Sequence, residues 1–203
     1  SGMQWVAGRS YSSDSEEYEL EVYYQNEDGD WVGPATITSA DGHNVLADVS
    51  YARLGNGNFV LAWTEQHLAS GDRRVRFSQF DKEVGVFSDS APILANGLHK
   101  YGAVLASNFP GNTLVVTLLE RNVDNELYVV AASFDTEENQ WSTEASFDDL
   151  EGSPSALNLA VNQFGHAQAV WKQGTELIGS SYNGVLDLWA SEEPINTTGT
   201  EVG

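Results

Sequence analysis

The spacing of aromatic residues constrains the fold of this chain more than any other feature of its sequence. A pair of aromatic residues seven positions apart recurs along the chain at a nearly regular interval, and four successive pairs are 56, 54 and 48 residues apart. The pairs are Tyr24 and Trp31, Phe80 and Phe87, Phe134 and Trp141, and Tyr182 and Trp189. A period of about 50 residues is typical of repeat proteins, in which each unit is one supersecondary element that packs against its neighbours.

The residues that flank these pairs repeat with them. The first aromatic is followed by a turn-forming polar residue, and in the first, second and fourth units the second aromatic is followed by a segment that contains a proline and an isoleucine. Upstream, residues 57–63 align with residues 165–171, and residues 112–118 fill the same place in the unit between them. Each unit is therefore predicted to contain four short strands joined by tight turns. In the second unit these strands are predicted near 45–53, 58–66, 73–80 and 86–93.

The third strand is less regular than the rest of the repeat. Apolar residues alternate at Leu20, Val22 and Tyr24, and again at Val75 and Phe77, but the two sets have opposite parity relative to the terminal aromatic. A β-bulge would reconcile them. We therefore expect either a bulge here or a register that differs by one residue between the first two units.

Four-stranded units of this period predict an all-β chain that forms a β-propeller of about four four-stranded blades. Each blade is a small sheet that can bury its faces only against neighbouring blades. Within this single domain the blades are expected at about 4–41, 42–97, 98–151 and 152–203.

The first unit lacks a counterpart of the innermost strand, which begins near His43, His99 and Ser153 in the other units. The propeller is therefore expected to be incomplete. Because open strand edges are usually covered, we expect either a second copy of the chain, forming a homodimer, or further sequence of a longer chain to complete it.

A family resemblance rests on these same motifs. The pattern Gly-Asn-x-x-Leu-Ala-Trp, then an aromatic with Asp or Asn, then Trp before a Pro-Ile strand, resembles the sialidase-like β-propellers of secreted bacterial proteins, whose repeats carry an Asp-box (BNR-type) turn. Residues 133–135 and 181–183 keep the start of the Asp-box, whereas its glycine is missing and the tryptophan falls one position late. The resemblance spans nearly the whole chain and implies a secreted, periplasmic or cell-surface bacterial protein. It also implies an arginine triad that grips a carboxylate, but Arg73, Arg74 and Arg76 crowd into one strand, so sialidase chemistry is not expected.

The charge of the chain limits its partners. Nine Lys and Arg against thirty Asp and Glu give a formal charge of −21, which repels nucleic acid and anionic lipid. No apolar stretch is long enough for a membrane span, and with no cysteine there are no disulfides. Most acidic residues are expected in solvated loops. The segment with Asn26, Asp28 and Asp30 has the oxygen ligands of a calcium site without an EF-hand loop, so calcium is the one cofactor that the sequence leaves open.

Candidate ligand-binding residues are His43, His99 and Tyr101. The two histidines are 56 residues apart, so they occupy the same place in successive blades, where the innermost strand starts and near one mouth of the central channel. A histidine there could act as acid or base, and ligands commonly bind in such clefts. The alternative is that a repeated position keeps its residue for turn structure. Periodic tryptophans are expected in blade cores rather than as sugar platforms, and Trp5 alone has no assigned place.

The sequence contains no catalytic motif, which favours a non-enzymatic binding or scaffold module for a carbohydrate or protein ligand. The alternative is a polysaccharide-processing enzyme, a lyase or glycosidase, with His43 or His99 as a proton-transfer group near the channel. A propeller that serves only assembly is a third hypothesis, which the sequence does not separate from the first.

Overall fold

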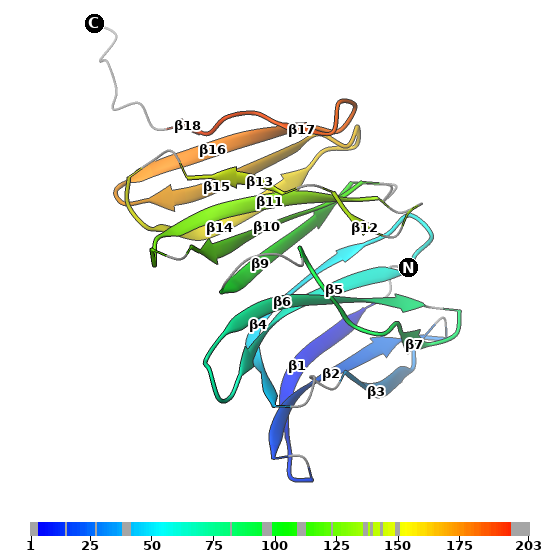
Figure 1. The fold of residues 1–203 in the computed structure, drawn as a ribbon. Helices are drawn as coiled ribbons and strands as arrows, with labels where there is room; N and C mark the ends of the chain where they lie inside the picture. The colour runs from blue at the N-terminus through cyan, green and yellow to red at the C-terminus, as the bar shows by residue number, and fades with distance from the viewer. Residues whose placement is uncertain are drawn as a thin grey trace, which may run out of the picture.

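A computed structural model describes residues 4–14, 16–26, 28–37, 42–81, 83–94, 99–108, 113–122, 124–135, 138, 140–142, 144–148 and 151–195. These residues form four antiparallel sheets and no helix, which confirms the all-β propeller class (Figure 1). The described part of the chain thus has no helix that could cross a membrane.

The strands follow the predicted units. Sheet A contains β1 (Trp5–Ser12), β2 (Glu17–Gln25) and β3 (Trp31–Ile37). Sheet B contains β4 (His43–Arg53), β5 (Phe59–His67), β6 (Arg73–Asp81), β7 (Val86–Phe87) and β8 (Ala91–Pro92). Sheet C contains β9 (Lys100–Ser107), β10 (Leu114–Arg121), β11 (Leu127–Asp135), β12 (Gln140–Trp141) and β13 (Ala145–Phe147). Sheet D contains β14 (Pro154–Val161), β15 (Ala167–Gln173), β16 (Glu176–Asn183), β17 (Leu188–Trp189) and β18 (Glu193–Pro194). In sheets B, C and D two short segments share the outermost position, because both pair with the third strand.

The four sheets succeed one another face to face, from the blue N-terminal sheet to the orange C-terminal sheet in Figure 1, and the first and last do not meet. Strands β4, β9 and β14 begin sheets B, C and D, and β9 lies beside both of the others. Sheet A has no such strand among the described residues, since its order is β1-β2-β3. The expectation of an open propeller is therefore confirmed, and the described part of the first blade holds no innermost strand.

An apolar core fills each space between neighbouring sheets. Buried residues between sheets A and B include Leu20, Val22, Leu61, Trp63 and Phe80. Those between sheets B and C include Val60, Val75, Phe77, Val116 and Phe134. Those between sheets C and D include Val129, Ala131, Phe147, Trp171 and Ile178. Apolar burial between blades is thus what stabilises this arrangement.

The third strands differ in parity because sheet B has two neighbours and sheet A has one. Val75 and Phe77 face sheet C, whereas Phe80 on the same strand faces sheet A. The ladder between β5 and β6 runs without a register shift, whereas the pairing of β2 with β3 shifts by one residue between Val22 and Tyr24, so the irregularity that the sequence predicts lies in the first unit. A strand buried on both faces carries apolar residues of both parities.

The pairing register between the third and outermost strands of the first unit differs by one residue from that of the other units, which is the second of the two expectations from the sequence. Phe80, Phe134 and Tyr182 lie opposite their aromatic partners, but Trp31 lies opposite Gln25 and not Tyr24. In the other sheets, the aromatic residue equivalent to Trp31 packs against the preceding blade. Among the residues that the structure describes, no sheet lies on that side of sheet A, so Trp31 is 51% exposed and its expected place in a blade core is wrong.

The recurring polar residue after the first aromatic closes a turn. Asp81 Oδ1 accepts a hydrogen bond from the Glu83 amide (2.8 Å), and Asp135 Oδ1 accepts one from the Glu138 amide (3.0 Å). Asn183 Oδ1 likewise accepts a bond from an amide two residues on. These side chains mimic a backbone turn, which explains why the position repeats.

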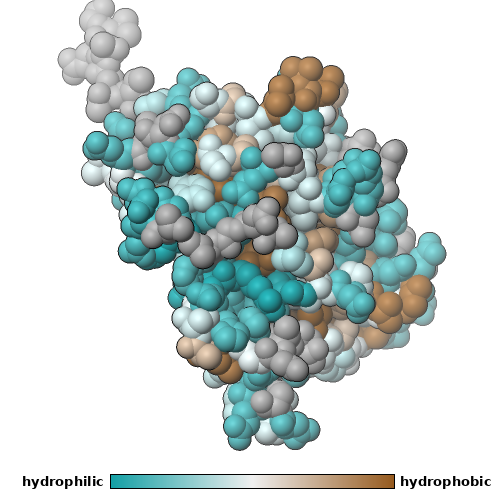
Figure 2. Space-filling model, viewed as in Figure 1, coloured by the Kyte–Doolittle hydropathy of each residue, from teal (hydrophilic) through white to brown (hydrophobic). Residues whose placement is uncertain are grey.

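The visible face of the molecule is mainly hydrophilic, with small, separate hydrophobic patches (Figure 2). Some of the most exposed apolar side chains, Val84, Val185 and Leu186, lie in the turns that precede the outermost strands. Isolated exposed apolar residues of this kind are common on protein surfaces and do not by themselves mark an interface.

Candidate functional site

The structure brings His43 and His99 to one pocket, which we call the His43–His99 pocket. It encloses about 680 Å³. His43 is the first residue of β4, and His99 directly precedes β9. The turn between β5 and β6 and the segment after β8 form the other walls. Polar lining residues are His43, His67, Ser70, Asp72, Arg73, Arg74, Arg76, His99 and Lys100.

Histidines from three segments are held in this pocket. The rings of His43 and His67 have centroids 4.8 Å apart. The Ser70 amide donates to His67 Nδ1 (3.2 Å), and the Ser70 hydroxyl donates to the Asp72 carboxylate (2.7 Å). His99 Nε2 lies 3.5 Å from the other oxygen of Asp72. The β5–β6 turn therefore links His67 and His99 through Ser70 and Asp72.

Two of the arginines are held by hydrogen bonds within the second blade. Arg74 donates from Nε and Nη2 to one oxygen of Glu65, at 3.0 and 2.8 Å, and Glu65 is fully buried. Trp63 Nε1 donates to the other oxygen of Glu65 (3.2 Å). Arg76 donates to the hydroxyl and carbonyl of Ser90. Burial lowers the pKa of Arg76, although the nearby Glu65 carboxylate opposes this shift.

Arg73 has no carboxylate partner among the described residues. Its guanidinium lies over the ring of Tyr101, 5.3 Å from the centroid, which is cation–π geometry. Tyr101 follows Lys100 on β9, so this contact joins the second and third blades. His43, His99 and Tyr101, the three candidates from the sequence, thus lie in or beside this pocket.

Lys100, which also lines the His43–His99 pocket, is enclosed by carboxylates. Its ammonium donates to Glu120 and to Glu144, the latter at 2.8 Å, and its side chain is almost fully buried. Burial raises the pKa of Glu144, an effect that Lys100 opposes and Glu120 reinforces. Burial, followed by a hydrogen bond to Glu120, raises the pKa of Tyr128. One ammonium and two carboxylates thus form a largely buried charge cluster that anchors the start of β9.

The pocket is unusual for the charge of this chain. Four of its lining residues, Arg73, Arg74, Arg76 and Lys100, belong to the nine Lys and Arg of a chain whose formal charge is −21. Arg74, Arg76 and Lys100 are balanced by Glu65, Glu120 and Glu144. Arg73 is therefore the lining cation whose charge could meet an anionic ligand group. The sequence signal for this site is the crowding of three arginines in one strand, the same feature that argues against a sialidase triad.

The predicted calcium segment forms the turn between β2 and β3. The Asp30 amide donates to Asn26 Oδ1 (2.9 Å), and the Gly29 amide donates to the Asn26 carbonyl (3.1 Å). The oxygens of Asn26 therefore serve the turn, and Asp28 and Asp30 are exposed. In the described ranges, no group of three or more His, Cys, Asp or Glu side chains is placed to hold a metal ion.

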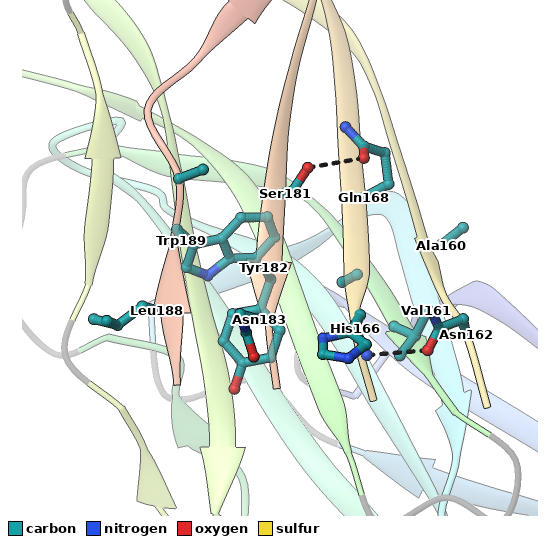
Figure 3. Close-up of a pocket in the computed structure, with 12 residues that line it drawn as sticks. Ala160, Val161, Asn162, His166, Gln168, Ser181, Tyr182, Asn183, Leu188 and Trp189 are labelled. Atoms are coloured by element: carbon teal, nitrogen blue, oxygen red, sulfur yellow. Dashed lines mark hydrogen bonds between the residues drawn. The ribbon is translucent and has the colours of Figure 1, made fainter. Parts of the chain in front are cut away.

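A second, open pocket of about 720 Å³ lies on sheet D (Figure 3). Its polar groups are already engaged in the fold. Tyr182 donates to Asp187 (2.6 Å), and burial together with this bond raises the pKa of Tyr182 to about 12. His166 Nδ1 accepts from the Gly184 amide (3.3 Å), and Ser181 donates to Gln168 (3.1 Å).

One buried polar atom beside the sheet D pocket lacks a hydrogen bond. Within the described chain, Trp189 Nε1 has no partner. The equivalent Trp141 Nε1 in the third blade is in the same state, so this is a property of the repeat position and not a sign of a ligand. With no charged lining residue, the sheet D pocket carries less chemistry than the His43–His99 pocket.

Comparisons with known proteins support the fold. No protein-family model and no curated protein sequence matches the chain. Among solved structures it is similar to a protein of unknown function from Dyadobacter fermentans (TM-score 0.65, 12% identity, 95% of this chain and 65% of that one). It is also similar to the Hadza microbial sialidase Hz136 (TM-score 0.61, 10% identity, 94% of this chain and 44% of that one). A third is the polysaccharide lyase Uly1 (TM-score 0.55, 9% identity, 93% of this chain and 59% of that one). The chain thus spans between 44% and 65% of these proteins' lengths, and the likeness is one of fold.

Proposed function

We propose that this protein is a non-enzymatic module that binds an acidic carbohydrate in the His43–His99 pocket. The observation that carries the proposal is Arg73, which lines this pocket of a strongly acidic protein and has no carboxylate partner among the described residues. A guanidinium in this state can form charge-assisted bonds to a carboxylate or sulfate group. Tyr101 beneath Arg73 offers an aromatic ring beside the charge.

The fold is consistent with this ligand class. Two of the proteins with a similar fold are, by name, a sialidase and a polysaccharide lyase. A secreted, periplasmic or cell-surface bacterial protein would meet acidic polysaccharides, and we include that location in the proposal. Because function resides in sites and not in folds, the test has to address the pocket itself.

Replacing Arg73 with alanine is expected to weaken binding of an oligogalacturonate about 10–100-fold, which corresponds to losing a hydrogen bond to a charged group. The affinity of the unaltered protein should fall as salt is raised, because partly exposed charges are screened. Isothermal titration calorimetry at two salt concentrations would measure both effects.

Two controls accompany that titration. Arg121→Ala removes an arginine that donates to Asn125 outside the pocket, and it should leave the affinity unchanged. The fully methyl-esterified oligosaccharide keeps the sugar but loses the charge, so it should bind at least about tenfold more weakly. Equal affinity for the acid and its ester would contradict an acidic-carbohydrate site.

The second candidate function is an enzyme, a lyase or glycosidase, and the contact between His99 Nε2 and Asp72 favours it. A carboxylate can orient a histidine that transfers a proton. If this function holds, His99→Ala and His43→Ala variants with unchanged thermal unfolding should lose at least about 100-fold in turnover. Reducing-end and unsaturated-uronate assays on the acidic oligosaccharide would detect the two reactions. An absence of product with the unaltered protein would favour the binding module.

A further inference from the structure

Strand β1 has a free edge where every other sheet has an innermost strand. By the pairing of second and third strands, β1 is the counterpart of β5, β10 and β15. Those three strands pair on their inner side with β4, β9 and β14. In the described part of the chain, no strand pairs with the inner edge of β1. The edge of β1 therefore has room for one more strand, at the position that β4, β9 and β14 occupy in the other three sheets.

The hydrogen-bond pattern shows which residues of β1 face this place. The Gln25 amide donates to the Gln4 carbonyl (2.7 Å), so Gln4 points toward β2. The β1–β2 ladder has no register shift, and in an antiparallel pair the direction alternates from residue to residue. Trp5, Ala7 and Arg9 therefore direct their N–H and C=O groups to the free edge.

Side chains beside the edge leave a groove of about 500 Å³ at the start of β1. Trp5 stacks on Phe59 with centroids 4.0 Å apart and contacts Tyr51 at 4.5 Å. Tyr51 is 62% exposed, although it lies on an innermost strand. This groove is at the opposite end of β4 from His43, so it is separate from the proposed carbohydrate site.

Sheet C shows how an innermost strand contacts the innermost strand of the preceding blade. The Leu105 amide of β9 donates to Ser50 Oγ of β4 (2.9 Å), and Ser107 Oγ donates to the Arg53 carbonyl (2.6 Å). Leu105 is buried in the core between sheets B and C. A strand beside β1 would similarly cover the exposed ring of Tyr51.

We propose that the free edge of β1 binds an extended polypeptide segment, which adds to sheet A as an antiparallel innermost strand. Unpaired backbone donors and acceptors in a row are matched by another β-strand and not by a sugar. Arg9, which stacks on Tyr18, and Arg53 lie beside this edge, so the segment should be neutral or acidic. Its residues that face the core should be small or apolar, as in β9 and β14.

The register of the added strand follows from sheet D. There Ala160 lies opposite Gln168 and Asn158 opposite Val170. Since the Gln4–Gln25 pair corresponds to the Ala167–Tyr182 pair, Trp5 and Ala7 correspond to Gln168 and Val170. A peptide with the sequence of residues 153–162 should therefore bond to Trp5 and Ala7 through its own Ala160 and Asn158 positions.

Amide hydrogen exchange, measured by NMR on the whole protein with and without this synthetic peptide, tests the proposal. We expect the peptide to slow exchange of the Ala7 and Arg9 amides about tenfold or more, because they gain partners. The Gly8 amide, which already faces β2, should change little. A control peptide with proline at the Asn158 and Ala160 positions lacks the two donors and should protect neither amide.

Three results would overturn the proposal. The first is unchanged exchange at millimolar peptide, and the second is equal protection by the proline peptide. The third is slow exchange of the Ala7 and Arg9 amides in the protein alone at every concentration, since the edge would then already be covered. Protection by xylohexaose with none by the peptide would assign the groove to a saccharide and would also reject a strand.

Discussion

Replacing Lys100 with methionine is expected to lower the free energy of unfolding by about 3–5 kcal/mol at neutral pH. Methionine keeps most of the buried side-chain volume but removes the ammonium group that both Glu120 and Glu144 accept bonds from. Leaving a buried carboxylate without its cation destabilises the folded state by much more than the intact ion pair stabilises it. Urea unfolding followed by tryptophan fluorescence would measure the loss.

The loss should shrink as the pH is lowered. Burial already raises the pKa of Glu144, and Lys100 opposes that rise, so the pKa should rise further in Lys100→Met. A carboxyl group whose pKa is higher in the folded state binds more protons there, so its contribution to stability falls as pH rises through that pKa. The deficit of the variant should therefore be largest above the raised pKa and decrease as pH falls toward the ordinary value of 4.5.

Lys172→Met provides the matched control, because Lys172 is exposed on β15. Its effect should stay within about 0.5 kcal/mol at every pH, as for most surface substitutions. If Lys100→Met lost no more stability than this control, the buried cluster would not anchor the start of β9. A deficit that grew on acidification would contradict the direction of the Glu144 shift.

The sequence predicted the units of this fold because its signals are local. The aromatic pairs and turn residues recur within one hairpin, and the structure places Phe80 opposite Phe87 and closes the turn with Asp81. It also predicted the missing innermost strand, since a repeat shows an absence by comparison with its other copies. The one-residue shift at Trp31 depends on which side of a sheet has a neighbour, and no local pattern contains that information.

The candidate site was predicted only in part for a similar reason. Spacing alone brought His43 and His99 to equivalent positions, and the structure places both in one pocket. Their sharing of one pocket depends on how the β5–β6 turn meets the start of the next blade. The contact of Arg73 with Tyr101 joins two sheets, and the burial of Glu65 decides which arginines are occupied. Such contacts form between side chains that are far apart in the sequence, and the periodicity of the sequence does not predict them.

Replacing Trp63 with alanine is expected to lower the free energy of unfolding by about 3–5 kcal/mol. Trp63 is fully buried between sheets A and B, and its Nε1 donates to Glu65, which the substitution would deprive of one partner. Trp171 occupies the equivalent place in the fourth blade and donates to Gln173 (2.9 Å), so Trp171→Ala should cost a similar amount.

Trp31→Ala is the control, because half of that side chain already meets solvent and no neighbouring sheet covers it. Its cost should stay below about 1.5 kcal/mol, in proportion to the apolar area lost from contact. Urea denaturation of the three variants would rank them. Since the blades bury their faces only against one another, a cost for Trp31→Ala equal to that for Trp63→Ala would mean that another surface covers sheet A in solution. That result would argue against an open first blade.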